Sequence, residues 1–147
     1  MASAYVVGPI DASQIERAYC LVSAVGYDID VDGWRQVCAT NLLRNYPSPY
    51  VEDIVVVEDP RGYVRGIAIL RARHSERLGR YLSVPVFASI TAADARGVCE
   101  TLLRYIRTAA RKKQCNAIHI ASLRTNRWPV GAGETEMEFD GILIPLR

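Results

Sequence analysis

One β-hairpin pattern constrains the fold of this chain more than any other feature. An apolar run at 54–57 is followed by the turn sequence DPRG at 59–62, and a second run with alternating apolar positions covers 63–73. Pro60 presets the backbone angle that a turn needs, and Gly62 can adopt the positive φ that closes a hairpin. The sequence therefore predicts two antiparallel strands joined by a tight turn.

The period of the apolar residues predicts the remaining elements. We expect strands at 5–8, 81–90, 117–120 and 137–146, and helices at 11–25, from 32 onward and over 95–110. Asp11 and Gln14 form a capping pair for the first helix. Pro85 should cause an edge, a bulge or a splay in its strand. The order predicts an α/β (α+β) fold, a mixed, mostly antiparallel central sheet flanked by helices.

Composition narrows the class of protein. The 147 residues fit a single domain, 1–147, and half of them are hydrophobic. A net charge of +2 gives no reason to expect nucleic acid, and no apolar run approaches the roughly 20 residues of a membrane span. The N-terminus has no basic segment typical of a signal peptide. The four cysteines show no metal-ligand spacing and are interpreted as buried apolar residues of a cytoplasmic protein.

Three segments together resemble the GCN5-related N-acetyltransferase (GNAT) superfamily. The hairpin at 55–70 has a glycine early in its second arm, Gly66, as that family does. The segment LLRYIRTAARKKQCNAIHI at 102–120 resembles the family's central helix and the strand after it, and MEFDGILI at 137–144 resembles its last strand. The resemblance implies a GNAT-like fold.

The family's phosphate loop corresponds to DARGVC at 94–99. In the family this loop reads Gln or Arg, two residues, Gly, one residue, then Gly or Ala. A glycine at a helix start lets backbone N–H groups approach the pyrophosphate of coenzyme A. Gly97 matches, whereas Asp94 replaces the basic or amide residue and Cys99 replaces the small one. Arg96 is placed to supply a phosphate contact instead.

The same residues also fit an ordinary helix start. Thr91 and Asp94 have the spacing of a capping box, which would start the helix at about Ala92. Gly97 is then only an interior glycine, costing about 1 kcal/mol relative to alanine. Both interpretations remain open at this stage.

The resemblance implies acetyl-CoA or another acyl-CoA as co-substrate and an amine as acceptor, with direct transfer between them. The residues implied in binding the coenzyme are Ser89, Ile90, Arg96, Gly97, Val98, Cys99 and Asn126. The family's usual tyrosine is missing from 122–134, and 81–90 has no acidic residue, so the catalytic acid and base are left unassigned. His119 is interpreted as a packed strand histidine.

Two further expectations concern partners. The basic residues of the last helix are interpreted as a solvated face, or else as a contact for an acidic partner or for the ribose phosphate of the coenzyme: Arg104, Arg107, Arg111, Lys112 and Lys113. The alternative to an enzyme is a non-catalytic domain of the same fold that acts in dimerisation or partner binding. Its final strand would pair with a second copy at the sheet edge.

Overall fold

A computed structural model describes residues 5–43, 53–89, 94–121 and 141–146. The elements in chain order are β1 (Val6–Pro9), the 3₁₀ turn η1 (Ala12–Gln14), α1 (Ile15–Ala24), α2 (Val31–Leu43), β2 (Asp53–Glu58), β3 (Val64–Ser75), β4 (Gly79–Ser89), α3 (Ala95–Lys112), β5 (Ala117–Ala121) and β6 (Gly141–Pro145). None of the helices in these ranges is long and apolar enough to cross a membrane.

The strands form one sheet in the order β1-β2-β3-β4-β5-β6. Every neighbouring pair is antiparallel except β4 and β5, which are parallel and joined by α3. The mixed, mostly antiparallel sheet is therefore confirmed. Of the predicted last strand, β6 covers Gly141–Pro145, and residues 137–140 lie outside the described ranges.

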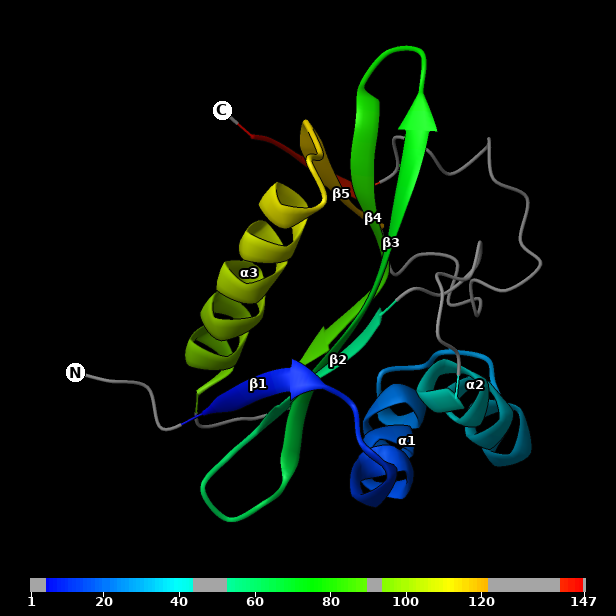
Figure 1. The fold of residues 1–147 in the computed structure, drawn as a ribbon. Helices are drawn as coiled ribbons and strands as arrows, with labels where there is room; N and C mark the ends of the chain where they lie inside the picture. Colours follow the sequence, from blue (N-terminus) through cyan, green and yellow to red (C-terminus); the bar gives the residue numbers. More distant parts are fainter. Residues whose placement is uncertain (1–4, 44–52, 90–93, 122–140, 147) are drawn as a thin grey trace.

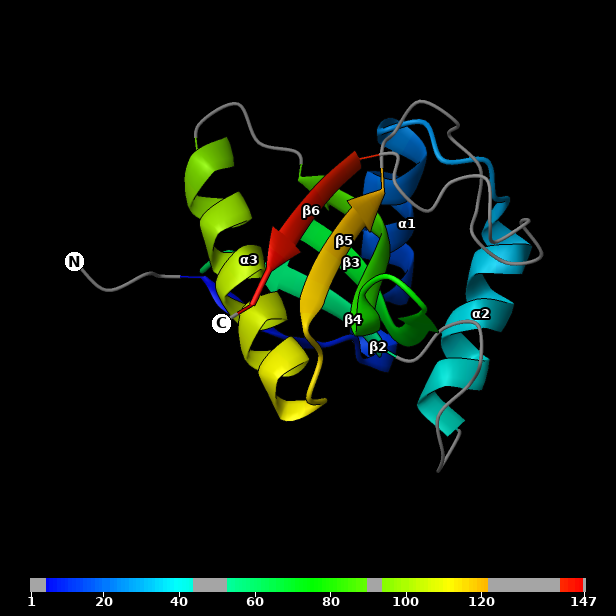
Figure 2. The same cartoon turned by 90° about the horizontal axis from the view of Figure 1, so that it is seen from above.

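Helices cover both faces of the sheet, with α3 on one face and α1 and α2 on the other (Figures 1 and 2). Strand alternation divides the core into two clusters accordingly. The strand residues packed with α3 are Val55, Val57, Ala68, Leu70, Leu82, Val84, Ile118 and Ile120. Those on the face of α1 and α2 are Ile54, Val56, Val64, Ile67, Ile69, Val86 and Ala88.

The predicted hairpin forms as its turn chemistry requires. Gly62 has φ of +87°, and the Asp59 carboxylate accepts the backbone N–H groups of Arg61 and Tyr63 at 2.9 and 3.0 Å. Pro85 lies inside an unbroken β4, and the register between β3 and β4 shifts opposite it, between Ile69 and Arg71. The expected irregularity at the proline is therefore a bulge.

The first helix begins as predicted. Asp11 accepts the Ser13 N–H at 2.9 Å, and the Gln14 side chain accepts the Asp11 N–H at 3.0 Å, which completes the capping box. One expectation for this region is wrong. Cys20 is exposed rather than buried, whereas Cys38 is fully buried. Cys20 lies on the exposed side of α1, whose buried residues are Ala18, Leu21 and Val22.

The cysteines differ in expected reactivity. Burial, and then the negative charge of Glu16, raises the pKa of the Cys38 thiol to about 12. Because alkylation needs an accessible thiolate, iodoacetamide at pH 8 should modify Cys20 of the folded protein and leave Cys38 unmodified. Peptide mass spectrometry measures both sites, and a sample unfolded in urea, in which both should react, is the control. Equal labelling in the folded state would contradict the packing of α2.

Candidate functional site

The parallel pairing of β4 and β5 is short. It covers Tyr81 to Val84 of β4 and ends at the pair Val84–Ile120. β4 continues to Ser89 and over this part pairs only with β3 among the described residues. Pro85, which has no N–H to donate, is the first residue after the ladder ends. The carboxyl end of β4 thus extends past its parallel neighbour and leads towards the start of α3.

The helix α3 starts at Ala95, with Asp94 as its N-cap. Asp94 has φ of −152° and lies outside the helix, and its carboxylate accepts the Gly97 N–H at 3.1 Å. The alternative start at about Ala92 with a Thr91 cap is therefore wrong; Thr91 itself lies outside the described residues. The sequence predicted Asp94 as an unfavourable charge or as the third residue of a Thr91 capping box, whereas Asp94 is itself the N-cap, as aspartate commonly is.

A tyrosine near the N-terminus, Tyr5, also binds the carboxylate of Asp94. The Tyr5 hydroxyl donates to the second carboxylate oxygen of Asp94 at 2.7 Å. That hydrogen bond is the main reason why the pKa of Tyr5 is raised, so the phenol stays protonated and remains a donor at neutral pH. The carboxylate of Asp94 therefore occupies a place at the helix N-terminus that suits an anion.

Gly97 is required by the cap as well as by the family's loop. A Cβ on Gly97 would lie 2.7 Å from the Asp94 carboxyl carbon and closer still to its oxygen Oδ2. No real Cβ makes such a contact, so any larger residue would displace the carboxylate. The glycine that identified the phosphate loop in the sequence thus has a structural reason to be there whether or not a phosphate binds.

The other predicted binding residues fall into different environments. Arg96 is exposed over 89% of its side chain and pairs with Glu100 at 3.3 Å. Val98 is fully buried against the sheet, so only its backbone is available to a ligand. Cys99 is half-buried, and its Sγ lies 3.4 Å from the Ser89 Oγ. Ile90 and Asn126 lie outside the described residues.

Gly66 allows α3 to approach the sheet closely. A Cβ at this position would lie 2.7 Å from Val98 Cγ1 and 3.1 Å from Leu102 Cδ1. The glycine early in the second hairpin arm therefore sets the distance between β3 and the first turns of α3. This is the physical reason for the glycine on which the resemblance rests.

Sequence reasoning missed a row of buried polar residues. Arg71, Ser83 and His119 are paired in register across β3, β4 and β5, and all are less than 9% exposed. Their strand neighbours pack with α3, so the row faces the opposite side of the sheet. His119 lies one pair before the β4–β5 ladder ends. Matching alternate positions across predicted neighbouring strands would have brought the three residues together.

The comparisons with known proteins concern the fold. No protein-family model matches the sequence, and no curated protein matches it either. Among solved structures, a GNAT family acetyltransferase from Staphylococcus aureus has a TM-score of 0.66 and 11% identity, over 92% of this chain and 99% of that one.

Two further solved structures are similar. The putative acetyltransferase yncA from Salmonella typhimurium, solved with acetyl-CoA, has a TM-score of 0.57 and 18% identity over 81% of this chain and 70% of its own. A transcriptional regulator from Bacillus halodurans has a TM-score of 0.60 and 9% identity, over 92% of this chain and 99% of its own. The chain therefore has the GNAT fold, which confirms the expectation from the sequence. At these identities the fold is what is shared.

Proposed function

We propose that the chain, as one domain spanning 1–147, transfers an acyl group from acetyl-CoA or another acyl-CoA to an amine. The observation that carries this proposal is the contact between the Ser89 Oγ and the Cys99 Sγ, which are 3.4 Å apart. It brings the free carboxyl end of β4 against the first turn of α3, in a fold shared with an acetyltransferase solved with acetyl-CoA. Binding sites of α/β proteins are common where neighbouring strands separate.

The chemistry needs few side chains. The amine nitrogen attacks the thioester carbonyl, a C–N bond forms, the C–S bond breaks and the coenzyme leaves as a thiolate that takes up a proton. Holding amine and thioester together removes much of the entropic barrier. Backbone groups of Ser89 and Ile90 would orient the pantetheine arm, with Asn126 as a further polar contact. The N-terminal amides of α3 and Arg96 would bind phosphate.

The attacking amine must lose a proton, and we propose His119 as its acceptor. Histidine exchanges protons near neutral pH, and His119 lies beside the end of the β4–β5 ladder. His119→Ala should lower kcat by about 10²-fold or more and leave KM for acetyl-CoA unchanged. The pH profile of kcat should lose its acidic limb. His74→Ala, at an exposed histidine of β3, is the control. An unchanged profile in His119→Ala would exclude this role.

Binding tests the function directly. Calorimetry should detect acetyl-CoA binding, and bound ligand should raise the unfolding temperature, because any ligand that prefers the folded state stabilises it. In a Cys20→Ser background, acetyl-CoA should also slow alkylation of Cys99 at the proposed site. Absence of both effects at millimolar acetyl-CoA would reject the proposal.

A second candidate is a non-catalytic domain that dimerises. Two observations favour it: Asp94 occupies the Gly97 amide, which a phosphate would use, and the edge strand β6 exposes Ile142 by 60% and Leu143 by 40%. Exposed apolar edge strands tend to pair with another chain. Light scattering combined with the acetyl-CoA titration separates the candidates. A dimer without ligand binding supports the non-catalytic domain, and turnover of acetyl-CoA supports the enzyme.

A further inference from the structure

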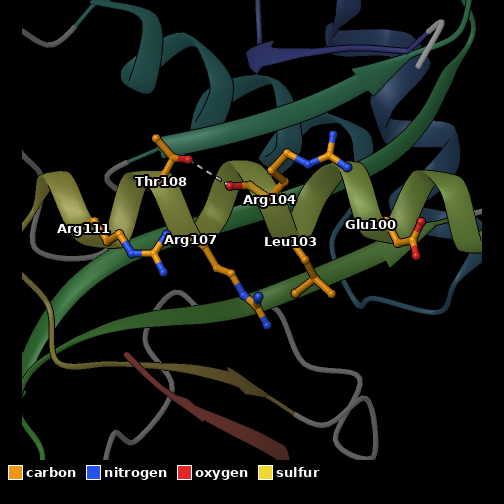
Figure 3. A pocket seen from close by; sticks show the side chains of 6 residues that line it. All are labelled: Glu100, Leu103, Arg104, Arg107, Thr108 and Arg111. Atoms are coloured by element: carbon orange, nitrogen blue, oxygen red, sulfur yellow. Dashed lines mark hydrogen bonds between the residues drawn. The ribbon is translucent and has the colours of Figure 1, made fainter. Parts of the chain in front are cut away.

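The outward side of α3 carries a hollow that acyl transfer does not use. Its volume is about 500 Å³, and it is lined by Glu100, Leu103, Arg104, Arg107, Thr108 and Arg111. Figure 3 shows Arg107 and Arg111 projecting to one side of the helix axis and Arg104 to the other, so the lining spans the width of the outward face. A volume of this size is within the range of small-ligand sites, roughly 300–1,000 Å³.

The charge of this lining is unbalanced. Among the described residues, Arg104, Arg107 and Arg111 form no ion pair, and the one carboxylate in the lining, Glu100, pairs with Arg96 at 3.3 Å. Three other arginines do pair with carboxylates: Arg17 with Glu58, Arg35 with Glu16 and Asp32, and Arg65 with Asp59.

The spacing of the three arginines places them on one face of α3. They follow one another at three and then four positions along α3, the spacing at which helical side chains are neighbours and like charges repel. From Arg104 to Arg111 the helix rises by about 10 Å. Guanidinium groups bind phosphate through two parallel hydrogen bonds, and a ligand with several negative charges would relieve the repulsion. Thr108 and Leu103 add a hydroxyl and an apolar contact.

The hollow is separate from the proposed acyl-donor site. Counting along the helix at 1.5 Å per residue, Arg104 lies about 10 Å from Gly97 and Arg111 about 21 Å. A phosphate held at the helix N-terminus is therefore not held by Arg107 or Arg111.

We propose that this face of α3 is a binding site for a small molecule carrying two or more phosphate groups, distinct from the acyl-donor site. Arg107 and Arg111 bind the ligand on one side of the helix axis, and Arg104 binds it on the other. A ligand with two or more phosphates suits this lining, because its phosphates can contact Arg107 and Arg111 on one side of the helix and Arg104 on the other at the same time.

Inorganic tripolyphosphate is the probe. Calorimetry on the full chain should show it binding more tightly than orthophosphate, with affinity that falls as salt rises. Arg107→Gln should weaken binding by about ten-fold. Arg61→Gln, which removes the same charge from an exposed arginine in the β2–β3 turn, should leave binding unchanged. Saturating acetyl-CoA should not displace the probe.

Three results would overturn the site as proposed. Equal weakening in Arg107→Gln and Arg61→Gln would mean that only net charge matters. Competition by acetyl-CoA, together with weaker acetyl-CoA binding in Arg107→Gln, would assign the arginines to the acyl donor. Tighter binding of a hexaglutamate peptide than of tripolyphosphate would assign the face to an acidic protein segment. Because the tripolyphosphate titration does not depend on acetyl-CoA binding, it gives a result even where the acyltransferase proposal fails.

Discussion

Replacing Gly66 with alanine is expected to destabilise the protein by about 1–3 kcal/mol, the usual cost of forcing an extra methyl group into a packed core. The new Cβ would lie 2.7 Å from Val98 and 3.1 Å from Leu102, both of them fully buried. Relief requires α3 to move away from β3. Urea unfolding measures the change in free energy, and the same shift should also separate Ser89 from Cys99.

Gly8→Ala is the matched control for Gly66→Ala. Gly8 also lies in a strand, β1, but a Cβ there would meet no atom within 4 Å. Its substitution should change the free energy of unfolding by no more than about 0.5 kcal/mol. Equal destabilisation by the two substitutions would show that strand conformation, rather than the close approach of α3, explains the effect at Gly66.

Replacing Asp94 with asparagine is expected to tighten acetyl-CoA binding by about five- to ten-fold, because it removes a negative charge a few ångströms from the proposed phosphate position. Asparagine caps helices as well as aspartate does, so α3 should keep its start and its hydrogen bond to Gly97. Calorimetry with acetyl-CoA measures the change.

Asp32→Asn is the control for Asp94→Asn, since Asp32 is an exposed carboxylate in the first turn of α2, on the other face of the sheet. It should leave acetyl-CoA affinity unchanged. If Asp94→Asn binds no better than the unaltered chain, the carboxylate does not compete with a phosphate. If neither chain binds acetyl-CoA at all, the non-catalytic candidate becomes the better one.

The fold was predictable because its signals are local. The turn at Asp59–Gly62 and the capping box at Asp11 specify their backbone within a few residues, and the structure has both. The register row of Arg71, Ser83 and His119 was not predicted, because it depends on which strands become neighbours. The role of Asp94 was missed for the same reason, since Tyr5, which donates to its carboxylate, lies 89 positions away in the sequence.

The candidate site was predictable only in part. DARGVC was correctly predicted to follow a strand and open the central helix, because the change from alternating to helical apolar spacing marks that boundary. Spacing alone could not distinguish a helix that starts at Ala92 from one that starts at Ala95. The start of the helix depends on the backbone conformation of Asp94, and it determines which backbone N–H of α3 a capping side chain binds, here that of Gly97.

The short parallel ladder between β4 and β5 also has a kinetic consequence. The pairing of Tyr81 with Ala117 closes a long loop that contains the whole of α3. The β2–β3 and β3–β4 hairpins, in contrast, close over short turns. Because closing a long loop costs entropy before any contact compensates for it, local hairpins form early and non-local pairs form late. We therefore expect the β4–β5 pairing, which ends beside the proposed donor site, to form later in folding than the β2–β3 and β3–β4 hairpins.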